Sequence, residues 1–442
     1  MNITARFREV LPADGVATSD DTVGAFAIDG LRPQCVLFPA TVADLGRCVA
    51  AADQAGLAVM PVGNGTQLGC GNPPQRYDVA LSTRRLARIL AHEAADMTVT
   101  VEAGATLAEV NAALEPARQH LPLDPPQPER TTIGAAIAAD ASGPLRLSQG
   151  KVRDLLIGVQ AVLADGTLIK GGGRVVKNVA GYDLMKLFTG SFGTLGAVVE
   201  ATFRLRPRPE REALFAVPAR EIGITASLAL EVLGASLAPL YVEALNQAAA
   251  TTLELGDGPL LIIGCGGSEE EIDVQSRRLQ DLAGRQRVRT YADADGAQIY
   301  RRLRDFPGGG SLSRFLGGGR GGFLGCKLSL LPSKLAQVLS DIEAEAGAKR
   351  MNCAILSHVG SGIAYVRCGA PDDDAVVQFA QRLRATARQA DGWAIFDLLP
   401  ARLKARLDAW DADVPGISLM RGVKKMLDPK GRFGPGRFVG GI

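Results

Sequence analysis

The sequence predicts an α+β protein of two or more domains, and three observations support this prediction. Between residues 41 and 170, short apolar runs alternate with amphipathic stretches, as strands and helices do. Beyond Pro207 and Pro209, the order of strands and helices predicts an antiparallel sheet that is covered on one face. The chain has 442 residues, too many for one ordinary core, so we expect a domain boundary near residue 210.

The elements of the first half have recognisable start and stop residues. Thr41 is the expected N-cap of a helix that runs to Gln54, and Gly56 follows as its stop. A buried strand at 57–62 then leads into a glycine-rich loop. We further expect strands at 98–103, 155–162 and 167–170, and a helix from 106 to about 119.

The second half contains longer helical stretches between apolar strands. We expect strands at 240–245, 259–264, 323–330 and 364–368, and helices at 268–283, 332–346 and 372–390. The segment Pro307–Phe323 contains eight glycines. Two interpretations remain open for it: a lid near a pocket, or a surface loop.

Composition and charge exclude several classes of protein. Hydrophobic residues make up 47% and charged residues 22%, which is typical of globular domains, and a net charge of +2 predicts no nucleic-acid partner. The seven cysteines form no CxxC pair, which argues against an iron–sulfur or zinc-ribbon site in this chain and favours a reducing cytoplasm. We find no signal peptide pattern and no apolar run of about 18 residues.

The first segment with chemical potential is Pro61-Val-Gly-Asn-Gly-Thr-Gln-Leu-Gly-Cys-Gly, directly after a predicted strand. Gly63 and Gly65 let the backbone curl and expose consecutive amides, which can hold an anion such as a diphosphate, and Thr66 adds a hydroxyl. A Rossmann fingerprint is disfavoured because Leu68 stands where its third glycine belongs. A simple tight turn remains the alternative.

The second segment, Thr131-Thr-Ile-Gly-Ala-Ala-Ile-Ala-Ala-Asp-Ala-Ser-Gly-Pro-Leu-Arg, has almost no bulky side chains between Gly134 and Gly143. A flat or extended ligand could approach such a backbone closely, and a tightly packed alanine-rich helix is the alternative. Under both interpretations we expect free amides near Thr131 and Thr132 that could bind phosphate.

The third segment begins at Lys177 and continues Asn-Val-Ala-Gly-Tyr-Asp-Leu-Met-Lys-Leu-Phe-Thr-Gly-Ser-Phe-Gly-Thr-Leu-Gly. It resembles the KNVxGYDLxxLxxGSxGTLG signature of FAD-linked hydroxy-acid oxidases. Together with the two earlier segments it makes residues 35–206 similar to the vanillyl-alcohol-oxidase superfamily of PCMH-type flavoproteins, and in particular to glycolate oxidase FAD-binding subunits. The segment Leu419–Phe438 resembles the closing pattern of that family, although Gly434 replaces its usual asparagine.

The resemblance implies a PCMH-type FAD-binding domain of two subdomains at 1–210, a ferredoxin-like cap at 211–400, and a segment at 401–442 that packs back on the FAD domain. It also implies noncovalent FAD. The loop implied to bind the FAD diphosphate comprises Pro61, Gly63, Asn64, Gly65, Thr66, Gln67 and Leu68. Other residues implied to line the cofactor are Thr131, Thr132, Ile133, Gly134, Ala138, Ala139, Gly143 and Arg146, with Val152 near the flavin ring and Val198 at the adenine end.

A metal site is not expected. Metal-dependent D-2-hydroxy-acid dehydrogenases of this superfamily carry a GHxGDGNLH segment, with both histidines near a divalent ion. The matching segment here keeps His358 but has Ser361, Ile363 and Tyr365 at the other positions. One imidazole alone rarely holds a divalent ion.

Candidate catalytic groups remain. Two interpretations are open for His358: a base for the substrate hydroxyl, or a remnant without a catalytic role. Tyr182 and Lys177 are alternatives near the flavin by resemblance, and Arg421 or Arg437 could hold a substrate carboxylate.

The predicted function is that of an FAD-dependent subunit of a glycolate oxidase-type complex, which oxidises a small 2-hydroxy acid to a 2-oxo acid or assists that oxidation. The implied partners are a homologous flavoprotein subunit and an iron–sulfur subunit, in the cytoplasm or peripherally at the inner membrane through those subunits. Two alternatives are a stand-alone FAD oxidase or dehydrogenase for another alcohol or hydroxy acid, and a non-catalytic assembly subunit.

Overall fold

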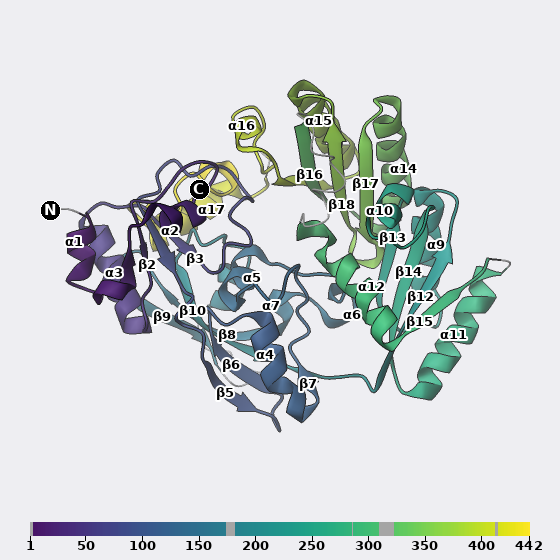
Figure 1. Ribbon diagram of the computed structural model, residues 1–442, viewed down its shortest axis with the longest axis horizontal. Coiled ribbons are helices and arrows are strands. Elements are labelled where there is room, and N and C mark those ends of the chain that lie inside the picture. Colours follow the sequence, from purple (N-terminus) through teal and green to yellow (C-terminus); the bar gives the residue numbers. More distant parts are fainter. Residues whose placement is uncertain (1–2, 174–181, 285, 309–321, 412–413) are drawn as a thin grey trace. The chain divides into compact units, whose positions relative to one another are not determined.

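The computed structural model describes residues 3–173, 182–284, 286–308, 322–411 and 414–442, which form two compact units (Figure 1). The first unit comprises Met1–Ser142, Lys151–Arg208 and Ala412–Ile442, and the second comprises Gly143–Gly150 and Pro209–Asp411. The short segment 143–150 therefore belongs to the second unit although it lies inside the predicted first domain. The predicted limits at 210 and 400 stay predictions.

The first unit contains a small sheet with the strand order β1-β2-β4-β3, in which β2, β4 and β3 are parallel. Its strands are β1 (Val16–Ala17), β2 (Cys35–Leu37), β3 (Val59–Val62) and β4 (Val79–Ser82), and the helices beside it are α1 (Ile3–Arg8), α2 (Asp20–Ala25) and α3 (Val42–Gln54). Every residue of β2 and β4 is buried, as is usual for parallel strands covered on both faces.

Helix α3 confirms the predicted N-cap. The Thr41 hydroxyl accepts a hydrogen bond from the Asp44 amide at 3.0 Å, and Gly56 lies just beyond the helix with φ +72°. The buried residues of this helix are spaced so that they share one face. The apolar pattern that predicted the helix therefore also identifies the face that packs against the core. The buried residues are Leu45, Cys48, Val49 and Ala52.

The first unit also contains an antiparallel sheet with the strand order β5-β6-β10-β8-β9. Its strands are β5 (Ile89–Glu93), β6 (Thr98–Glu102), β8 (Leu156–Val162), β9 (Leu168–Gly172) and β10 (Ala197–Arg204). The accompanying helices are α4 (Leu107–Leu114), α5 (Ile133–Ala139), α7 (Val152–Leu155) and α8 (Leu184–Phe188), and a short ribbon pairs β7 (Gln119–His120) with β11 (Arg206–Pro207). Helix α4 ends at Leu114 rather than near residue 119 because Pro116 has no amide to continue it, and a 3₁₀ turn follows.

The C-terminal segment belongs to the first unit and begins with α17 (Ile417–Leu427). Beyond the helix the chain runs beside β3: the Val59 amide donates to the Arg432 carbonyl at 2.7 Å, and the Gly434 amide donates to the Val59 carbonyl at 3.0 Å. Lys424 donates to the carbonyl of Thr194 at 2.7 Å and to the Asp428 carboxylate at 2.6 Å. Burial lowers the pKa of the Lys424 amine, and the nearby Asp428 opposes this shift.

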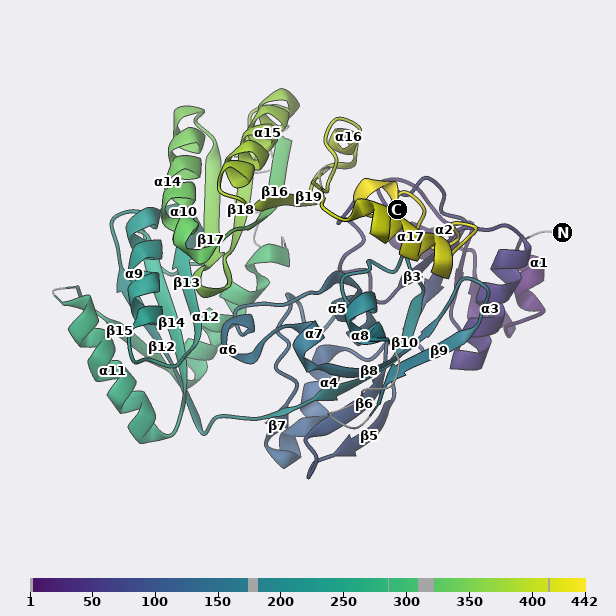
Figure 2. The ribbon, with the colours of Figure 1, turned by 180° about the vertical axis from the view of Figure 1, so that it is seen from behind.

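The second unit is built on an eight-stranded antiparallel sheet with the order β15-β12-β14-β13-β17-β18-β16-β19 (Figure 2). Its strands are β12 (Arg211–Pro218), β13 (Pro239–Leu245), β14 (Leu260–Gly267), β15 (Arg289–Ala292), β16 (Gly322–Ser329), β17 (Asn352–His358), β18 (Ile363–Ala370) and β19 (Trp393–Leu398). Its helices are α6 (Arg146–Gln149), α9 (Ile222–Gly234), α10 (Gln247–Thr252), α11 (Glu269–Ala283), α12 (Asp293–Asp305), α14 (Pro332–Ala348), α15 (Asp373–Gln389) and α16 (Ala401–Lys404).

Both faces of this sheet carry a core, so the prediction of one covered face is incomplete. Helices α9, α11, α14 and α15 pack on one face through residues such as Leu339 and Phe379. On the opposite face, Ala249 of α10 and Leu303 of α12 contribute to a second cluster. The predicted α+β class and the antiparallel sheet of the second half are confirmed.

Residues 309–321 of the glycine-rich segment lie outside the described residues, so both interpretations of it stay open. Within the described ranges, no helix is both long enough and apolar enough to cross a lipid bilayer.

Candidate functional site

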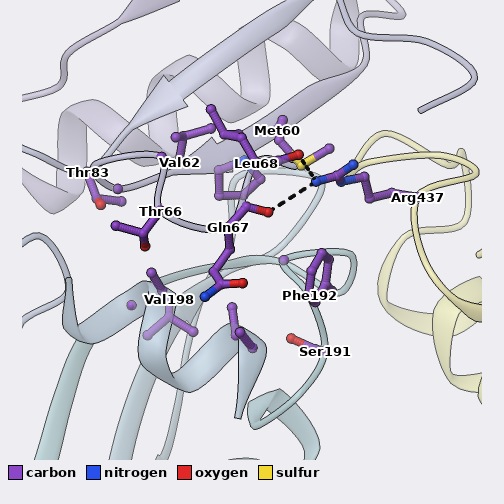
Figure 3. Close-up of a pocket in the computed structure, with 18 of the residues that line it drawn as sticks. Met60, Val62, Thr66, Gln67, Leu68, Thr83, Ser191, Phe192, Val198 and Arg437 are labelled. Atoms are coloured by element: carbon purple, nitrogen blue, oxygen red, sulfur yellow. Dashed lines mark hydrogen bonds between the residues drawn. The ribbon is translucent and has the colours of Figure 1, made fainter. Parts of the chain in front are cut away.

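A cavity in the first unit brings together many of the residues predicted to bind the cofactor (Figure 3). It encloses about 750 Å³, part of it open to solvent. The predicted residues that line it are Pro61, Gly63, Gly65, Thr66, Gln67, Leu68, Gly134, Ala138, Ala139 and Val198. Residues not predicted for this lining are Met60, Val62, Thr83, Ala135, Ser191, Phe192, Gly193, Gly196 and Arg437.

The loop after β3 is held tightly against the segment that precedes α5. A Cβ atom on Gly63 would lie 2.2 Å from the Thr132 hydroxyl oxygen, so only glycine fits there without displacement. Gly65 has φ +78°, a conformation that L side chains rarely adopt. The Asn64 side-chain amide donates to the Arg130 carbonyl at 2.9 Å and fixes the loop from its other side.

This loop offers hydrogen-bond donors that the protein itself does not use. Among the residues that the structure describes, no acceptor is bonded to the backbone amides of residues 64–67. The buried hydroxyl oxygen atoms of Thr66 and Ser191 likewise have no partner there. Buried polar groups are nearly always paired, and an unsatisfied one costs about 1–3 kcal/mol. These donors therefore suit a ligand that carries negatively charged oxygen atoms.

At the start of helix α5, on the opposite wall, most backbone amides are already engaged. The amides of Ile133 and Gly134 donate to the carbonyls of Ala105 and Ala103, both at 2.8 Å, and the Ala135 amide donates to the Thr132 hydroxyl at 3.3 Å. The expectation of free amides at this helix start is met only at Thr132, whose amide has no acceptor among the described residues, because the amide of Thr131 donates to the Gln127 carbonyl and those of the next residues donate as above. The helix contributes a bare wall of alanines instead.

Arg437 supports the loop from the C-terminal segment. Its guanidinium donates to the carbonyl of Asn72 at 2.9 Å and to the carbonyls of Gln67 and Leu68, and Figure 3 shows the last two bonds. The side chain is 2% exposed and lies over the Phe192 ring at 5.7 Å. Burial lowers the pKa of this guanidinium, with opposing contributions from nearby groups that include Asp29.

These bonds answer the suggestion that Arg437 holds a substrate carboxylate. Its donors are directed at main-chain carbonyls, so it fixes the shape of residues 67–72. The sequence pattern around Arg437 predicted that the C-terminal segment lies near the cofactor. It did not predict that Arg437 supports the loop, because the carbonyls that accept its hydrogen bonds lie more than 360 residues earlier in the sequence. Arg421 donates to the Gly440 carbonyl at 3.0 Å.

The remaining predicted cofactor residues do not line the cavity. Thr131 and Thr132 are buried just before α5, Ile133 is the buried first residue of that helix, and Val152 is buried in the core of the antiparallel sheet. Gly143 and Arg146 belong to the second unit. The roles predicted for these residues stay predictions.

Tyr182 and Lys177 were the alternative catalytic groups predicted near the flavin. Tyr182 is 93% exposed in the first unit. Lys177 lies outside the described residues. A catalytic role for Tyr182 stays a prediction.

His358 lies in the second unit and forms a buried pair with a residue that the sequence analysis did not name. It ends β17, directly opposite Glu243 of β13. The distance from His358 Nδ1 to Glu243 Oε2 is 2.5 Å, and the two side chains are 3% and 1% exposed. Within the described part of the chain, His358 Nε2 has no hydrogen-bond partner. The ring of Tyr365 packs edge-on against the imidazole at 5.4 Å.

No metal centre is visible in the described residues: they contain no group of three or more histidine, cysteine, aspartate or glutamate side chains arranged to hold an ion. The cysteines are unpaired by disulfides, and all but Cys70 are buried.

Two family models that match most of the chain define its class as an FAD-linked oxidoreductase. Residues 33–172 match the family model described as an FAD binding domain, and residues 224–438 match the model described as the C-terminal domain of FAD linked oxidases. The chain thus belongs to the FAD-linked oxidases, and FAD is its cofactor. The predicted family is confirmed.

Among known proteins, the chain is similar to glycolate oxidase subunit GlcD of Bacillus subtilis, with 32% identity over 50% of this chain and 47% of that protein. It is also similar to glycolate oxidase subunit GlcE of Escherichia coli, with 35% identity over 38% of this chain and 49% of that protein. Each match therefore spans about half the length of the relative. The crystal structure of p-cresol methylhydroxylase with substrate bound shares the fold, with a TM-score of 0.77, 16% identity and coverage of 98% of this chain and 95% of the other.

Proposed function

We propose that this chain oxidises a small 2-hydroxy acid to a 2-oxo acid, as a subunit of a glycolate oxidase-type complex. The single observation that carries the proposal is the cavity of the first unit, whose unengaged amides at 64–67 and unpartnered hydroxyls of Thr66 and Ser191 match the needs of a diphosphate. The similarity to two glycolate oxidase subunits supports a 2-hydroxy acid as the substrate class.

Bound FAD would supply a two-electron acceptor for the hydride of the α-carbon, and the hydroxyl would lose its proton as the C=O bond forms. The residues of this chain have separate tasks. The loop at 64–67 holds the diphosphate through its amides, and the alanine wall of α5 excludes water from the cofactor. Arg437 keeps the loop in the shape that presents these amides.

We further propose that His358 accepts the hydroxyl proton of the substrate. Its Nε2 atom has no partner among the described residues, and its ring is held by Glu243 and Tyr365. A general base needs such an unoccupied nitrogen within reach of the proton that it takes. Tyr182 is the alternative base.

The proposed partners are a homologous flavoprotein subunit and an iron–sulfur subunit. The chain has no CxxC pair that could hold its own iron–sulfur cluster, so its electrons would leave through another protein or a small acceptor. The similarity to both GlcD and GlcE supports a complex in which related flavoproteins work together. The second candidate function, a stand-alone FAD oxidase, is favoured by the buried pair of His358 and Glu243, because that pair would give the chain its own base.

The experiment is anaerobic reduction of the purified holoprotein, alone and with co-purified partner subunits. Glycolate, D-lactate, L-lactate and a simple primary alcohol are added in turn, and the flavin absorbance is followed. Bleaching by one 2-hydroxy acid is expected, with none from acetate or propionate, which lack the hydroxyl. Flavin that stays oxidised with every 2-hydroxy acid, with and without partners, would overturn the proposal.

The same preparation tests the attachment of the cofactor. Acid precipitation should leave the yellow colour in the supernatant, because noncovalent FAD is released when the protein unfolds. Colour that stays in the pellet would contradict noncovalent binding.

A further inference from the structure

Glu243 and His358 of the second unit form a buried acid–histidine pair. Glu243 and His358 lie directly opposite each other on neighbouring strands, on the sheet face that α12 covers rather than the face of α9 and α14. Both side chains are almost completely buried. A carboxylate is a hydrogen-bond acceptor, so the 2.5 Å contact requires the proton to lie between Nδ1 and Oε2.

This contact determines which nitrogen of His358 carries the proton. A neutral imidazole has one protonated and one bare nitrogen, and a hydrogen bond from one of them fixes the tautomer. With Nδ1–H bound to Glu243, the lone pair is on Nε2. Within the described residues that atom is buried and has no partner.

The neighbouring rings and charges keep this arrangement in place. The Tyr365 ring packs edge-on against the imidazole, which restricts its rotation. Arg367, whose guanidinium lies 5.4 Å from the Tyr365 ring, makes a two-point contact with Asp397 at 3.0 and 2.7 Å. A buried pair that served only packing would not be stabilised by leaving His358 Nε2 without a hydrogen bond.

We infer that Glu243 is a positioning residue that holds His358 in the Nδ1–H tautomer and leaves Nε2 ready to accept the substrate's hydroxyl proton. The inference rests on the proposed function, in which His358 is the base. As the O–H bond breaks, its proton would move to Nε2 and its electron pair would form the C=O bond, with bound FAD as the acceptor for the hydride of the α-carbon. The imidazolium that results is balanced by the Glu243 carboxylate.

The tautomer can be measured without any catalytic turnover. The chain has only three histidines, His92, His120 and His358, so the holoprotein labelled with ¹⁵N-histidine gives three imidazoles to assign by single substitutions. We expect His358 to show a protonated Nδ1 and an unprotonated Nε2 near neutral pH. In Glu243→Gln, the Nδ1–H signal should weaken or shift as the charged acceptor is lost.

Kinetics then test whether the tautomer matters for the reaction. With the 2-hydroxy acid that reduces the flavin, Glu243→Gln should lower kcat by about 10²–10⁴-fold, with a much smaller change in KM. His358→Gln should lower kcat to a similar level, and the double variant should be little worse than either single one. Ser357→Ala is the matched control, because Ser357 is equally buried on the same strand but directs its hydroxyl to the Ile363 carbonyl.

The outcomes separate this inference from the proposed function. A protonated Nε2 on His358 in the native holoprotein, or unchanged kcat in a folded Glu243→Gln variant, overturns the inference even where a 2-hydroxy acid reduces the flavin. The expected tautomer in a protein that no 2-hydroxy acid reduces would instead contradict the proposed function, while Glu243 would still be shown to set the protonation of His358.

Discussion

Two segments of the first unit were predicted to hold the FAD diphosphate through main-chain amides. In the structure they differ in how many of those amides are already hydrogen-bonded within the chain. The loop at 63–68 and the start of α5 at 131–139 are both poor in bulky side chains, and residues of both line one cavity. The loop has four consecutive amides without an acceptor among the described residues, whereas at the α5 start only the Thr132 amide lacks one. The α5 start donates its amides to carbonyls of Ala103 and Ala105 and to the Thr132 hydroxyl.

The difference shows what a run of small residues does and does not predict. Small side chains allow a ligand to approach the backbone, and this holds for both segments. Free donors depend on whether the backbone pairs with another part of the chain. Residues 131–134 pair with residues near 103–107, whereas residues 64–67 curl away from β3 and β4 after the strand has ended.

The largest expected effect comes from filling the contact between the two segments. In Gly63→Ala, the added Cβ would meet the Thr132 hydroxyl at 2.2 Å. Overpacking of this kind costs about 1–3 kcal/mol, and displacement of the loop should weaken FAD binding by about 10–100-fold. Unfolding of the apoprotein in urea and titration of FAD fluorescence measure the two effects.

The control is the double variant Gly63→Ala/Thr132→Ala, which removes the two closest atoms of Thr132. Its total loss should be smaller than the sum of the single losses, because each single change in a contacting pair includes the same clash or gap. Additive losses would show that the loop and Thr132 are not coupled.

Local pattern was enough to predict those elements whose cause is local. Thr41 predicted the start of α3 because a cap needs only its own hydroxyl and an amide three residues later. The strands at β6, β8 and β18 were predicted from apolar runs that the structure buries. In contrast, β12 and β17 were not predicted: prolines flank the first, and the second ends in the polar pair Ser357 and His358, whose burial depends on the sheet around them.

The sequence was enough to predict which backbone segments form the candidate site. It was not enough to predict which side chains form hydrogen bonds with one another there. The glycines of the loop were identified because their spacing has a direct conformational meaning. The partner of His358 could not be identified, because Glu243 is 115 residues earlier and meets it only through strand register. The support from Arg437 is similarly long-range, since its acceptors lie near residue 70.

A matched pair of substitutions sharpens the comparison at a smaller scale. Thr66→Val replaces a buried hydroxyl that has no protein partner, so the apoprotein should be as stable as before, while FAD binding weakens by about 2–10-fold. Thr132→Val removes the N-cap of α5, so the apoprotein should lose about 0.5–2 kcal/mol with little change in FAD affinity. Urea unfolding and FAD titration of both variants provide the test. If both variants lost FAD affinity equally, the assignment of the main diphosphate donors to the loop would be wrong.

The smallest expected effect is a difference between the pH dependence of FAD affinity and that of the free energy of unfolding. Neither 63–68 nor 131–139 contains an ionisable side chain, so FAD affinity should be flat between pH 5 and 8. Stability should not be flat, because burial, with a contribution from Arg208, lowers the pKa of His120 to about 4 from its ordinary 6.5.

The direction follows from which state binds the proton. Below pH 6.5 His120 becomes protonated in the unfolded chain, whereas in the folded unit it stays neutral until about pH 4. The free energy of unfolding is therefore unaffected by His120 above pH 6.5 and decreases as the pH falls from 6.5 towards 4. At pH 5 the loss is about 1 kcal/mol after allowance for solvent screening, or about 2–4 °C in the midpoint of thermal unfolding. In His120→Gln the decrease between pH 7 and 5 should be smaller by that amount, with the same FAD affinity. An FAD affinity that fell together with the unfolding midpoint would mean that a titrating group contributes to the loop after all.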